Sequence, residues 1–430
     1  MRRKPLVCLQ CSEDTDEACS QGEYKTSFFH CFFSVRLDRE CYNDFSPKKF
    51  LGESFVGILA RKVERNAWVG TSTTPVASRW QFLDAIRGLA AIAVVFQHML
   101  WPLSPGIATF FSTVWSPGRF GVVAFFLVSG FIVPRSLEQH GDVKAFWRAR
   151  FTRLFPAYWF SLLFIGLLPV AGIASLNGAD LGSLTVWIAN ISMLQGFAQV
   201  PEINPVAWTL GLELVLYSAI SVAFVKGFLG RTWFIAGSLL AIIGVSSIVL
   251  PYQLHIRFPA GASAVFGSII AGLTLFRWFT GKFKLAEAIA VTVLCLGVTA
   301  GSSIVNYSAT RSTTDDLQPT QLCAILSVAT GYLFFLLMLK ARSLTFPNWI
   351  LWLGKVSYSL YLLHPVALAL VPYSWSPAVI IPTQLTLSIV FAWFGYECIE
   401  LPSLDMAKRR LKKRELKLTK AKEVVFEQAA

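Results

Sequence analysis

Two ionisable residues share one apolar stretch of this sequence, "DAIRGLAAIAVVFQHML" (84–100), in which Arg87 precedes His98 by eleven positions. In an α-helix, eleven positions make three turns plus about 20°, so both side chains lie on one face. The rise between them is about 16 Å, which places the imidazole near the middle of a membrane if the arginine lies at its inner surface. There His98 could act as a general base in a polar track, or simply hydrogen-bond to a neighbouring helix.

A carboxylate interrupts a second apolar stretch, "WTLGLELVLY" (208–217). An unpaired carboxylate inside a membrane is unfavourable, so Glu213 is expected to pair with an arginine or with His98. Trp208 and Tyr217, which bound the stretch, are further candidate site residues.

Two arginines stand three positions apart in "FWRARFTRLFPAYW" (146–159). Arg150 and Arg153 are expected at the cytoplasmic start of a helix, close together on its surface. A guanidinium can bind a phosphate through two parallel hydrogen bonds, so this pair could hold an anionic cytosolic donor. Alternatively, the two arginines serve only to orient the helix in the membrane.

Three further residues could take part in chemistry, and each has a simpler alternative. His364 lies inside an apolar run that ends at Pro365, where it either reaches the site or bonds to a neighbouring helix. Glu400, in "YECIELP" (396–402), is expected to pair with basic residues at the cytoplasmic end of the last span. Ser129, in "FFLVSGF", could be a nucleophile, but Ser-Gly in a membrane helix more often permits close helix packing.

The elements that must position these residues are membrane-spanning helices. Of the 430 residues, 54% are hydrophobic and only 15% are charged, a balance too apolar for a soluble globule. Nearly every apolar run is long enough to cross a bilayer as a helix, which needs about 20 residues. The predicted fold class is an all-α, polytopic integral membrane bundle of about ten helices. The runs lie near residues 86–104, 119–136, 154–174, 207–227, 232–250, 259–276, 286–304, 321–340, 349–371 and 378–398.

The distribution of basic residues predicts the orientation of these spans. Another apolar stretch, 184–200, contains polar residues. If this stretch crossed the membrane, the later basic loops, such as 277–284, would lie on the side opposite the cytoplasm. Because basic residues accumulate in cytoplasmic loops, we expect 184–200 to be re-entrant or interfacial and both termini to be cytoplasmic. The location predicted is the inner (plasma) membrane. The formal charge of +13 is then explained without a nucleic-acid partner.

The sequence divides into three regions. Residues 1–80 are predicted to be an N-terminal cytoplasmic extension, either disordered or produced by a wrongly assigned start. They hold five of the eight cysteines, but the odd number and irregular spacing disfavour zinc, so no metal site is predicted. Residues 81–402 form the predicted membrane domain. Residues 403–430 form a basic tail that either contacts anionic membrane lipids or remains solvated as a topology anchor.

Six stretches together resemble membrane acyltransferase family 3, whose bacterial members O-acylate cell-surface and exported carbohydrates. The resemblance implies a ten-helix bundle, acyl-coenzyme A as cytosolic donor, and His98 and Arg87 as the central pair. It also implies functional weight for Glu213, Arg150 and Arg153. The stretches follow the family's order over about 320 residues: "LDAIRGLAAIAVVFQH", "GRFGVVAFFLVSGF", "RARFTRLFPAYW", "WTLGLELVLY", "LGKVSYSLYLLHP" and "YECIELP".

The function expected from the residues and the resemblance is a membrane O-acyltransferase. It would move an acyl group, in the first instance acetyl, from acyl-coenzyme A to a hydroxyl of a carbohydrate or lipid-linked glycan, with no permanently bound cofactor. His98 would be a general base or a transient acyl carrier. Val123 stands where many relatives carry an acidic residue, and no role is assigned there. The alternatives are a proton-coupled transporter, for which no internal repeat is visible, and a scaffold, which would not need buried charges.

Overall fold

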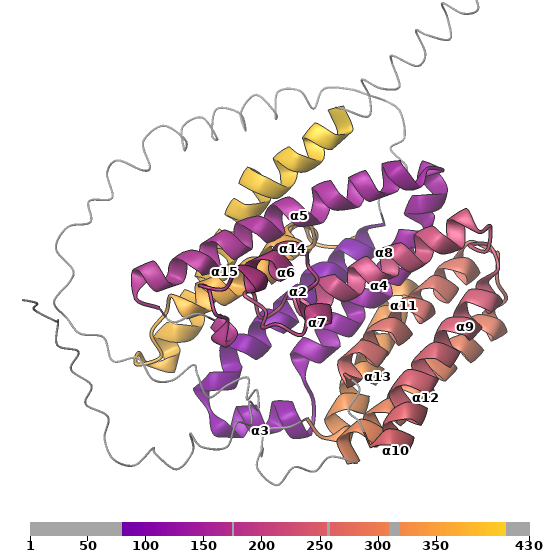
Figure 1. The fold of residues 1–430 in the computed structure, drawn as a ribbon, viewed down its shortest axis with the longest axis horizontal. Coiled ribbons are helices and arrows are strands. Elements are labelled where there is room, and N and C mark those ends of the chain that lie inside the picture. Colours follow the sequence, from indigo (N-terminus) through magenta and orange to yellow (C-terminus); the bar gives the residue numbers. More distant parts are fainter. Residues whose placement is uncertain (1–79, 174–175, 256–258, 309–318, 410–430) are drawn as a thin grey trace, which may run out of the picture. The chain divides into compact units, whose positions relative to one another are not determined.

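The part of the chain that the structure describes contains helices but no strand (Figure 1). This computed structural model therefore confirms the predicted all-α class. It describes residues 80–173, 176–255, 259–308 and 319–409. The predicted N-terminal extension, with the five cysteines for which zinc was disfavoured, lies outside these ranges, as does the basic tail from residue 410 onward.

Nine helices in these ranges are long and apolar enough to cross a membrane. Short 3-10 or π turns continue several of them, so that the segments run from 18 to 33 residues, which is enough to cross the hydrocarbon core of a bilayer. The helical membrane bundle predicted from the sequence is thus confirmed. The helices are α2 (Gln81–Leu100), α4 (Pro117–His140), α5 (Val143–Leu167), α8 (Trp208–Val225), α9 (Thr232–Gly244), α11 (Ala260–Phe279), α12 (Leu285–Ser308), α13 (Gln321–Lys340) and α15 (Pro377–Gly395).

The predicted span 349–371 forms α14 (Asn348–Ala369), which is long enough to cross but is not among these nine. Lys355, together with several serines and tyrosines, lowers its hydropathy. Most of its side chains are buried, and the helix packs along α2 and α15. A helix enclosed by other helices does not need an apolar surface towards lipid, which explains the difference in composition.

Residues 184–200 do not form a spanning helix. They fold as α6 (Leu184–Ile191) and α7 (Gln195–Ala198), and the eight residues of α6 rise only about 12 Å. The Asn190 side chain makes three hydrogen bonds of 2.9 to 3.1 Å to the backbone of Val186, Pro201 and Ile203. The polar residues of this stretch therefore hold a compact loop together.

Close helix contacts position α2, which carries the arginine and the histidine of interest. α4 packs along α2, α11 and α13. A Cβ atom added at Gly121 of α4 would collide with the Ala90 carbonyl of α2, so this spacing requires glycine. α14 approaches α2 just as closely, and a Cβ at Gly354 would collide with the Asp84 carbonyl. These two contacts hold α2 at short distances from α4 and α14.

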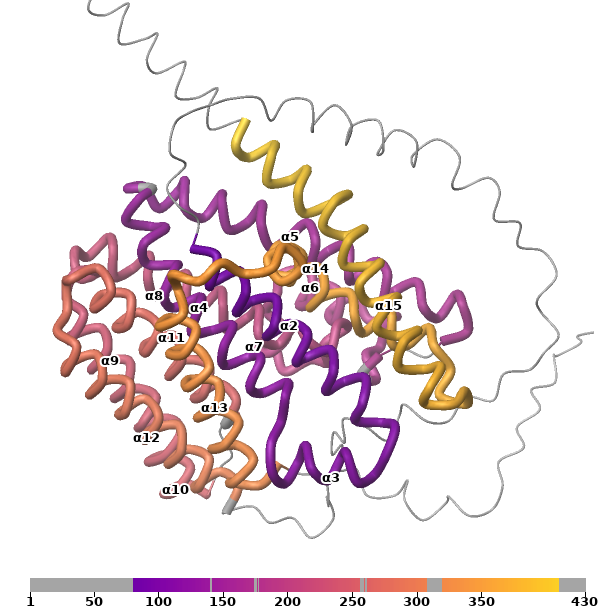
Figure 2. Tube along the Cα trace, turned by 180° about the vertical axis from the view of Figure 1, so that it is seen from behind, coloured from indigo at the N-terminus to yellow at the C-terminus, as the bar shows by residue number. Residues whose placement is uncertain are grey.

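α9, α11, α12 and α13 lie side by side and form a second part of the bundle (Figure 2). Their shared core is aliphatic and aromatic, and includes Ile243, Ile270, Val291 and Phe335. None of the candidate site residues lies on these four helices. α4 joins this part to α2, and the candidate site is therefore confined to the other part.

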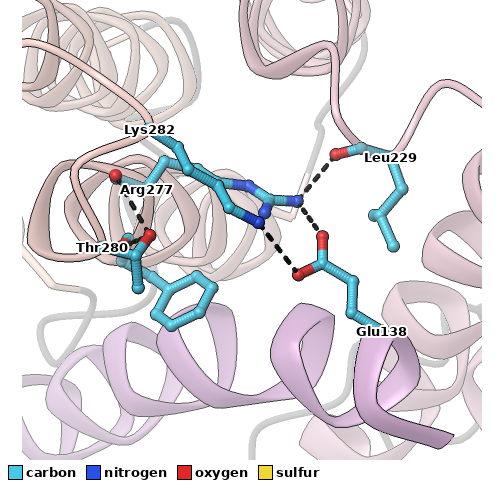
Figure 3. Close-up of polar contacts among 6 residues, drawn as sticks. Glu138, Leu229, Arg277, Thr280 and Lys282 are labelled. Atoms are coloured by element: carbon cyan, nitrogen blue, oxygen red, sulfur yellow. Dashed lines mark hydrogen bonds and ion pairs between the residues drawn. The ribbon is translucent and has the colours of Figure 1, made fainter.

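An ion pair whose arginine is buried and whose glutamate is partly exposed links α4 to α11 (Figure 3). Arg277 is only 1% exposed, and its Nη2 lies 2.5 Å from Glu138 Oε1 and 2.8 Å from the Leu229 carbonyl oxygen, in the α8–α9 connection. Lys282 Nζ lies 3.9 Å from the other carboxylate oxygen. The sequence assigned Arg277 to a basic loop, but the structure buries it as a pairing group. Removing Glu138 would leave the buried Arg277 without its opposite charge, which is unfavourable.

The connections on either side of α6 and α7 test the orientation of the chain. Because the basic loops predict cytoplasmic termini and 184–200 is too short to cross as a helix, we expect alkaline phosphatase fused after residue 180 or after residue 203 to be active outside the cytoplasm. The same reporter fused after residue 229, in a predicted cytoplasmic loop, is the inactive control. Opposite faces for the fusions at 180 and 203 would contradict this topology.

Candidate active site

Arg87 and His98 lie on one continuous helix, as their spacing requires. Both side chains are half-buried. Between them, the same face of α2 carries Ala91 and Val94, which line a cavity between α2, α4, α8 and α14. The arginine and the histidine thus stand at opposite ends of the part of α2 that borders this cavity.

The wall of the cavity is mostly apolar. Glu213 of α8 supplies the one carboxylate among its lining residues. The two tyrosines of α14 in the wall donate their hydroxyl hydrogens to backbone carbonyls, Tyr358 to Leu154 and Tyr361 to Val206, both at 2.8 Å. With these hydroxyls engaged, the wall offers few polar groups that could replace the water around a solvated ion.

A group of charges lies at the Arg87 end of the cavity. Arg87 interacts electrostatically with Arg153, Glu400 and Glu213. Glu400 is 3% exposed, and its Oε2 accepts a hydrogen bond of 2.9 Å from the Ser359 hydroxyl. The structure therefore brings together four predicted site residues from α2, α5, α8 and the π turn η7 (Tyr396–Glu400). Glu400 is influenced by the charges of Arg153 and Arg87, but its hydrogen-bond partner is Ser359, and its pairing with a basic residue stays a prediction.

Tyr217 connects Glu213 to the other predicted arginine. Its hydroxyl donates a hydrogen bond to Glu213 Oε1, and its ring centre lies 5.5 Å from the guanidinium carbon of Arg150. Arg150 donates to Ser136 Oγ at 2.6 Å, whereas its Nε–H has no hydrogen-bond partner among the described residues. A buried guanidinium with a free N–H suits an anionic ligand. The hydrogen-bond partner of Glu213 is therefore Tyr217, which is neither of the two kinds of partner expected, and Arg87 interacts with this carboxylate only through longer-range electrostatics.

The partner of His98 is instead His364 of α14. Nδ1 of His98 lies 2.9 Å from Nε2 of His364, and the two ring planes are inclined by only 6°. His364 is completely buried, and its Nδ1 lies 3.2 Å from the Leu360 carbonyl oxygen. The sequence identified both histidines as candidates but did not pair them, because the pairing depends on how α14 lies against α2.

Ser129 lies apart from the histidines. The backbone N–H of Gly118, on α4, donates a hydrogen bond to Gln97, the neighbour of His98. Ser129 lies eleven residues further along α4, which corresponds to a rise of about 16 Å. Ser129 thus lies too far from His98 to be activated by it, and its place beside a glycine fits the packing alternative. Trp208 is 38% exposed and packs against Gly261 of α11.

Comparison with known proteins places this arrangement in a family. Residues 80–396 match the acyltransferase family 3 model, described as an acyltransferase domain. The chain belongs to acyltransferase family 3. No solved structure matches it. The matched region of this acyltransferase runs from the start of α2 to the end of α15 and contains every site residue described above except Glu400.

Named relatives agree with this assignment. Acyltransferase MdmB of Streptomyces mycarofaciens is 25% identical over 316 residues, which cover 67% of this chain and 79% of its own length. Nodulation protein 10 of Rhizobium leguminosarum bv. viciae is 27% identical over 333 residues, 68% of this chain and 84% of its own. A protein of Staphylococcus aureus strain COL named for O-acetyltransferase activity is 24% identical, over 74% of this chain and 56% of its own.

A larger side chain at Val94 should block the cavity between the two ends of the site. We expect Val94→Phe to lower the rate of acyl transfer by about 10²-fold, because small displacements of a bound substrate have effects of this size. Val293→Phe is the matched control, since Val293 is 60% exposed on α12, away from the cavity. Acyl transfer and thermal unfolding are measured for both variants at equal abundance. A normal rate for Val94→Phe would show that no substrate uses this space.

Proposed function

We propose that this acyltransferase moves an acyl group, in the first instance acetyl, from cytosolic acyl-coenzyme A to a hydroxyl of a carbohydrate or lipid-linked glycan. The observation that carries the proposal is the cavity lined by Ala90, Ala91 and Val94 of α2 and by Glu213 of α8, because Arg87 and His98 lie about one helical turn before and after these α2 residues. We place the protein in the plasma membrane with both termini in the cytoplasm. In that orientation the charged end of the cavity faces the cytoplasm, where the donor is found.

The charged end would bind the nucleotide part of the donor. Arg87, Arg150 and Arg153 hold its phosphates, because guanidinium groups bind phosphate oxygens through paired hydrogen bonds. The unpartnered Nε–H of Arg150 supports this role. The carboxylates beside the arginines offset their charge while the donor is absent. The linear arm of coenzyme A then follows the apolar wall towards His98, over a rise of about 16 Å.

The transfer itself takes place at the imidazole. As the acceptor oxygen attacks the thioester carbonyl carbon, its proton passes to His98. The carbon–sulfur bond breaks, and the same proton is returned to the departing thiolate, so that the products are the ester and free coenzyme A. A second route, in which His98 is first acylated and then deacylated by the acceptor, uses the same nitrogen. Glu213 acts at the arginine end, with Tyr217, rather than on the imidazole.

The names of the relatives support transfer to oxygen. MdmB is named an acyltransferase, and the Staphylococcus aureus relative is named for O-acetyltransferase activity. Acetyl transfer to a hydroxyl is therefore the first reaction to assay. The acceptor is expected among the surface or secreted glycans of the producing cell.

Replacing His98 by alanine is the test of this function. We expect His98→Ala to lower acetyl incorporation into the cell's glycans by about 10²–10⁴-fold, the usual effect of losing a general base. Arg87→Lys should also be severely impaired, because an ammonium group cannot reproduce the guanidinium fork. Incorporation is measured by mass spectrometry of the glycans at matched membrane abundance, and coenzyme A binding to the purified variants is measured separately.

The matched control is His255→Ala, since His255 is exposed at the end of α10 (Leu250–Leu254). This variant should incorporate acetyl normally. Normal incorporation by His98→Ala would mean that the imidazole has only a packing role, and the proposed function would be wrong.

A further inference from the structure

We propose that His364 is a positioning residue, which holds His98 in the tautomer whose Nε2 carries the lone pair. The inference rests on the proposed function of His98 and adds a second residue to it. It follows from the hydrogen bonds around the two rings, from the burial of His364, and from the packing that fixes α14 against α2.

The surroundings of His364 determine which of its ring nitrogens carries the hydrogen. Its Nδ1 lies 3.2 Å from the Leu360 carbonyl oxygen, which can only accept a hydrogen bond. Pro365 has no N–H, so the Tyr361 carbonyl on the same turn of α14 receives no hydrogen bond from the residue four positions later. This edge of the ring therefore faces acceptors, and Nδ1 of His364 must carry the hydrogen.

The other ring nitrogen of His364, Nε2, is unprotonated. A proton on Nε2 as well would make the ring a cation, and this side chain is 0% exposed. Its described polar partners are backbone carbonyls and the imidazole of His98, none of which is an anion. A buried charge without an opposite charge is costly, so His364 is neutral and its Nε2 is an acceptor.

The unprotonated Nε2 of His364 determines the tautomer of His98. Its Nδ1 lies 2.9 Å from the acceptor Nε2 of His364, so this nitrogen is the donor. A neutral imidazole has one N–H, and the Nε2 of His98 is therefore left with the lone pair. That nitrogen is the one able to take a proton from an acceptor hydroxyl. The opposite tautomer would present an N–H to the hydroxyl and could not act as a base.

The packing of the helices keeps the two rings in this arrangement. A Cβ at Gly354 would collide with the Asp84 backbone, so α14 lies directly against α2. Near the histidines, Val95 of α2 and Leu360 of α14 are both fully buried in the same hydrophobic cluster. Neither helix can shift along the other without disturbing these contacts, and the hydrogen bond between the rings has a defined geometry.

During the reaction His364 remains neutral. When Nε2 of His98 takes the hydroxyl proton, the resulting imidazolium still donates its Nδ1 hydrogen to His364, and this bond becomes stronger because the donor is charged. The proton then goes from Nε2 of His98 to the thiolate sulfur. No proton leaves or enters His364, which acts only through His98, as an orienting group does for a catalytic histidine in other enzymes.

Two substitutions separate this role from a structural one. His364→Leu removes the acceptor while keeping a side chain of similar bulk, and kcat should fall about 10²–10⁴-fold with KM for acetyl-coenzyme A unchanged. His364→Gln offers a carbonyl oxygen that can accept the hydrogen bond from His98. Its kcat should therefore be at least about tenfold higher than that of His364→Leu. If the Gln variant, folded and at equal abundance, is as inactive as the Leu variant, or if the Leu variant is fully active, the positioning role is wrong.

Nitrogen-15 NMR of the purified protein in detergent, labelled at histidine, measures the tautomers without any turnover. The chain has only five histidines, and the signals of His98 and His364 are identified by their loss in His98→Ala and His364→Leu. We expect both rings to be neutral with an unprotonated Nε2. A protonated Nε2 on His98 would overturn the inference.

This readout distinguishes failure of the inference from failure of the proposed function. A protonated Nε2 combined with an inactive His98→Ala variant refutes only the role of His364. The expected tautomers combined with a fully active His98→Ala variant refute the function on which the inference rests, and the positioning role falls with it.

Discussion

The close approach of α2 to α4 and α14 is the constraint on which the candidate site depends. Gly121 and Gly354 permit this approach, because a side chain at either position would collide with the backbone of α2. The same packing borders the cavity with α2 and α4 and brings His364 within hydrogen-bonding distance of His98. In a membrane, where water does not drive helices together, small residues at such contacts are a main source of close packing.

The charges inside the bundle are arranged around this constraint. Arg87 and Arg153 interact electrostatically with Glu400, and Arg87 also with Glu213, although no direct ion pair joins these four residues within the described chain. Arg277 is compensated separately, by Glu138 on α4, and plays no part in the site. The imidazoles lie at the other end of the cavity, away from these charges. This separation keeps a neutral base distant from the groups that would bind an anionic donor.

Much of this arrangement follows from local sequence patterns, and the remainder depends on contacts between helices. The relation of Arg87 to His98 is predictable because both lie on one helix, where the helical period determines direction and rise. The pair formed by His98 and His364 joins positions 266 apart, and no local pattern encodes the register of two helices. The same reason applies to Arg277, whose burial becomes visible only when α4 and α11 are placed together.

In the proposed reaction, the donor enters the cavity along α2 until its thioester reaches His98. Photo-crosslinking tests it directly, with a coenzyme A thioester whose acyl group carries a diazirine, bound to the protein in lipid nanodiscs. After irradiation, mass spectrometry of the peptides should locate the label on α2 between Ala91 and His98 or on the facing walls of α8 and α14, and an excess of acetyl-coenzyme A should prevent it. Labelling confined to the loops outside the membrane would contradict the account.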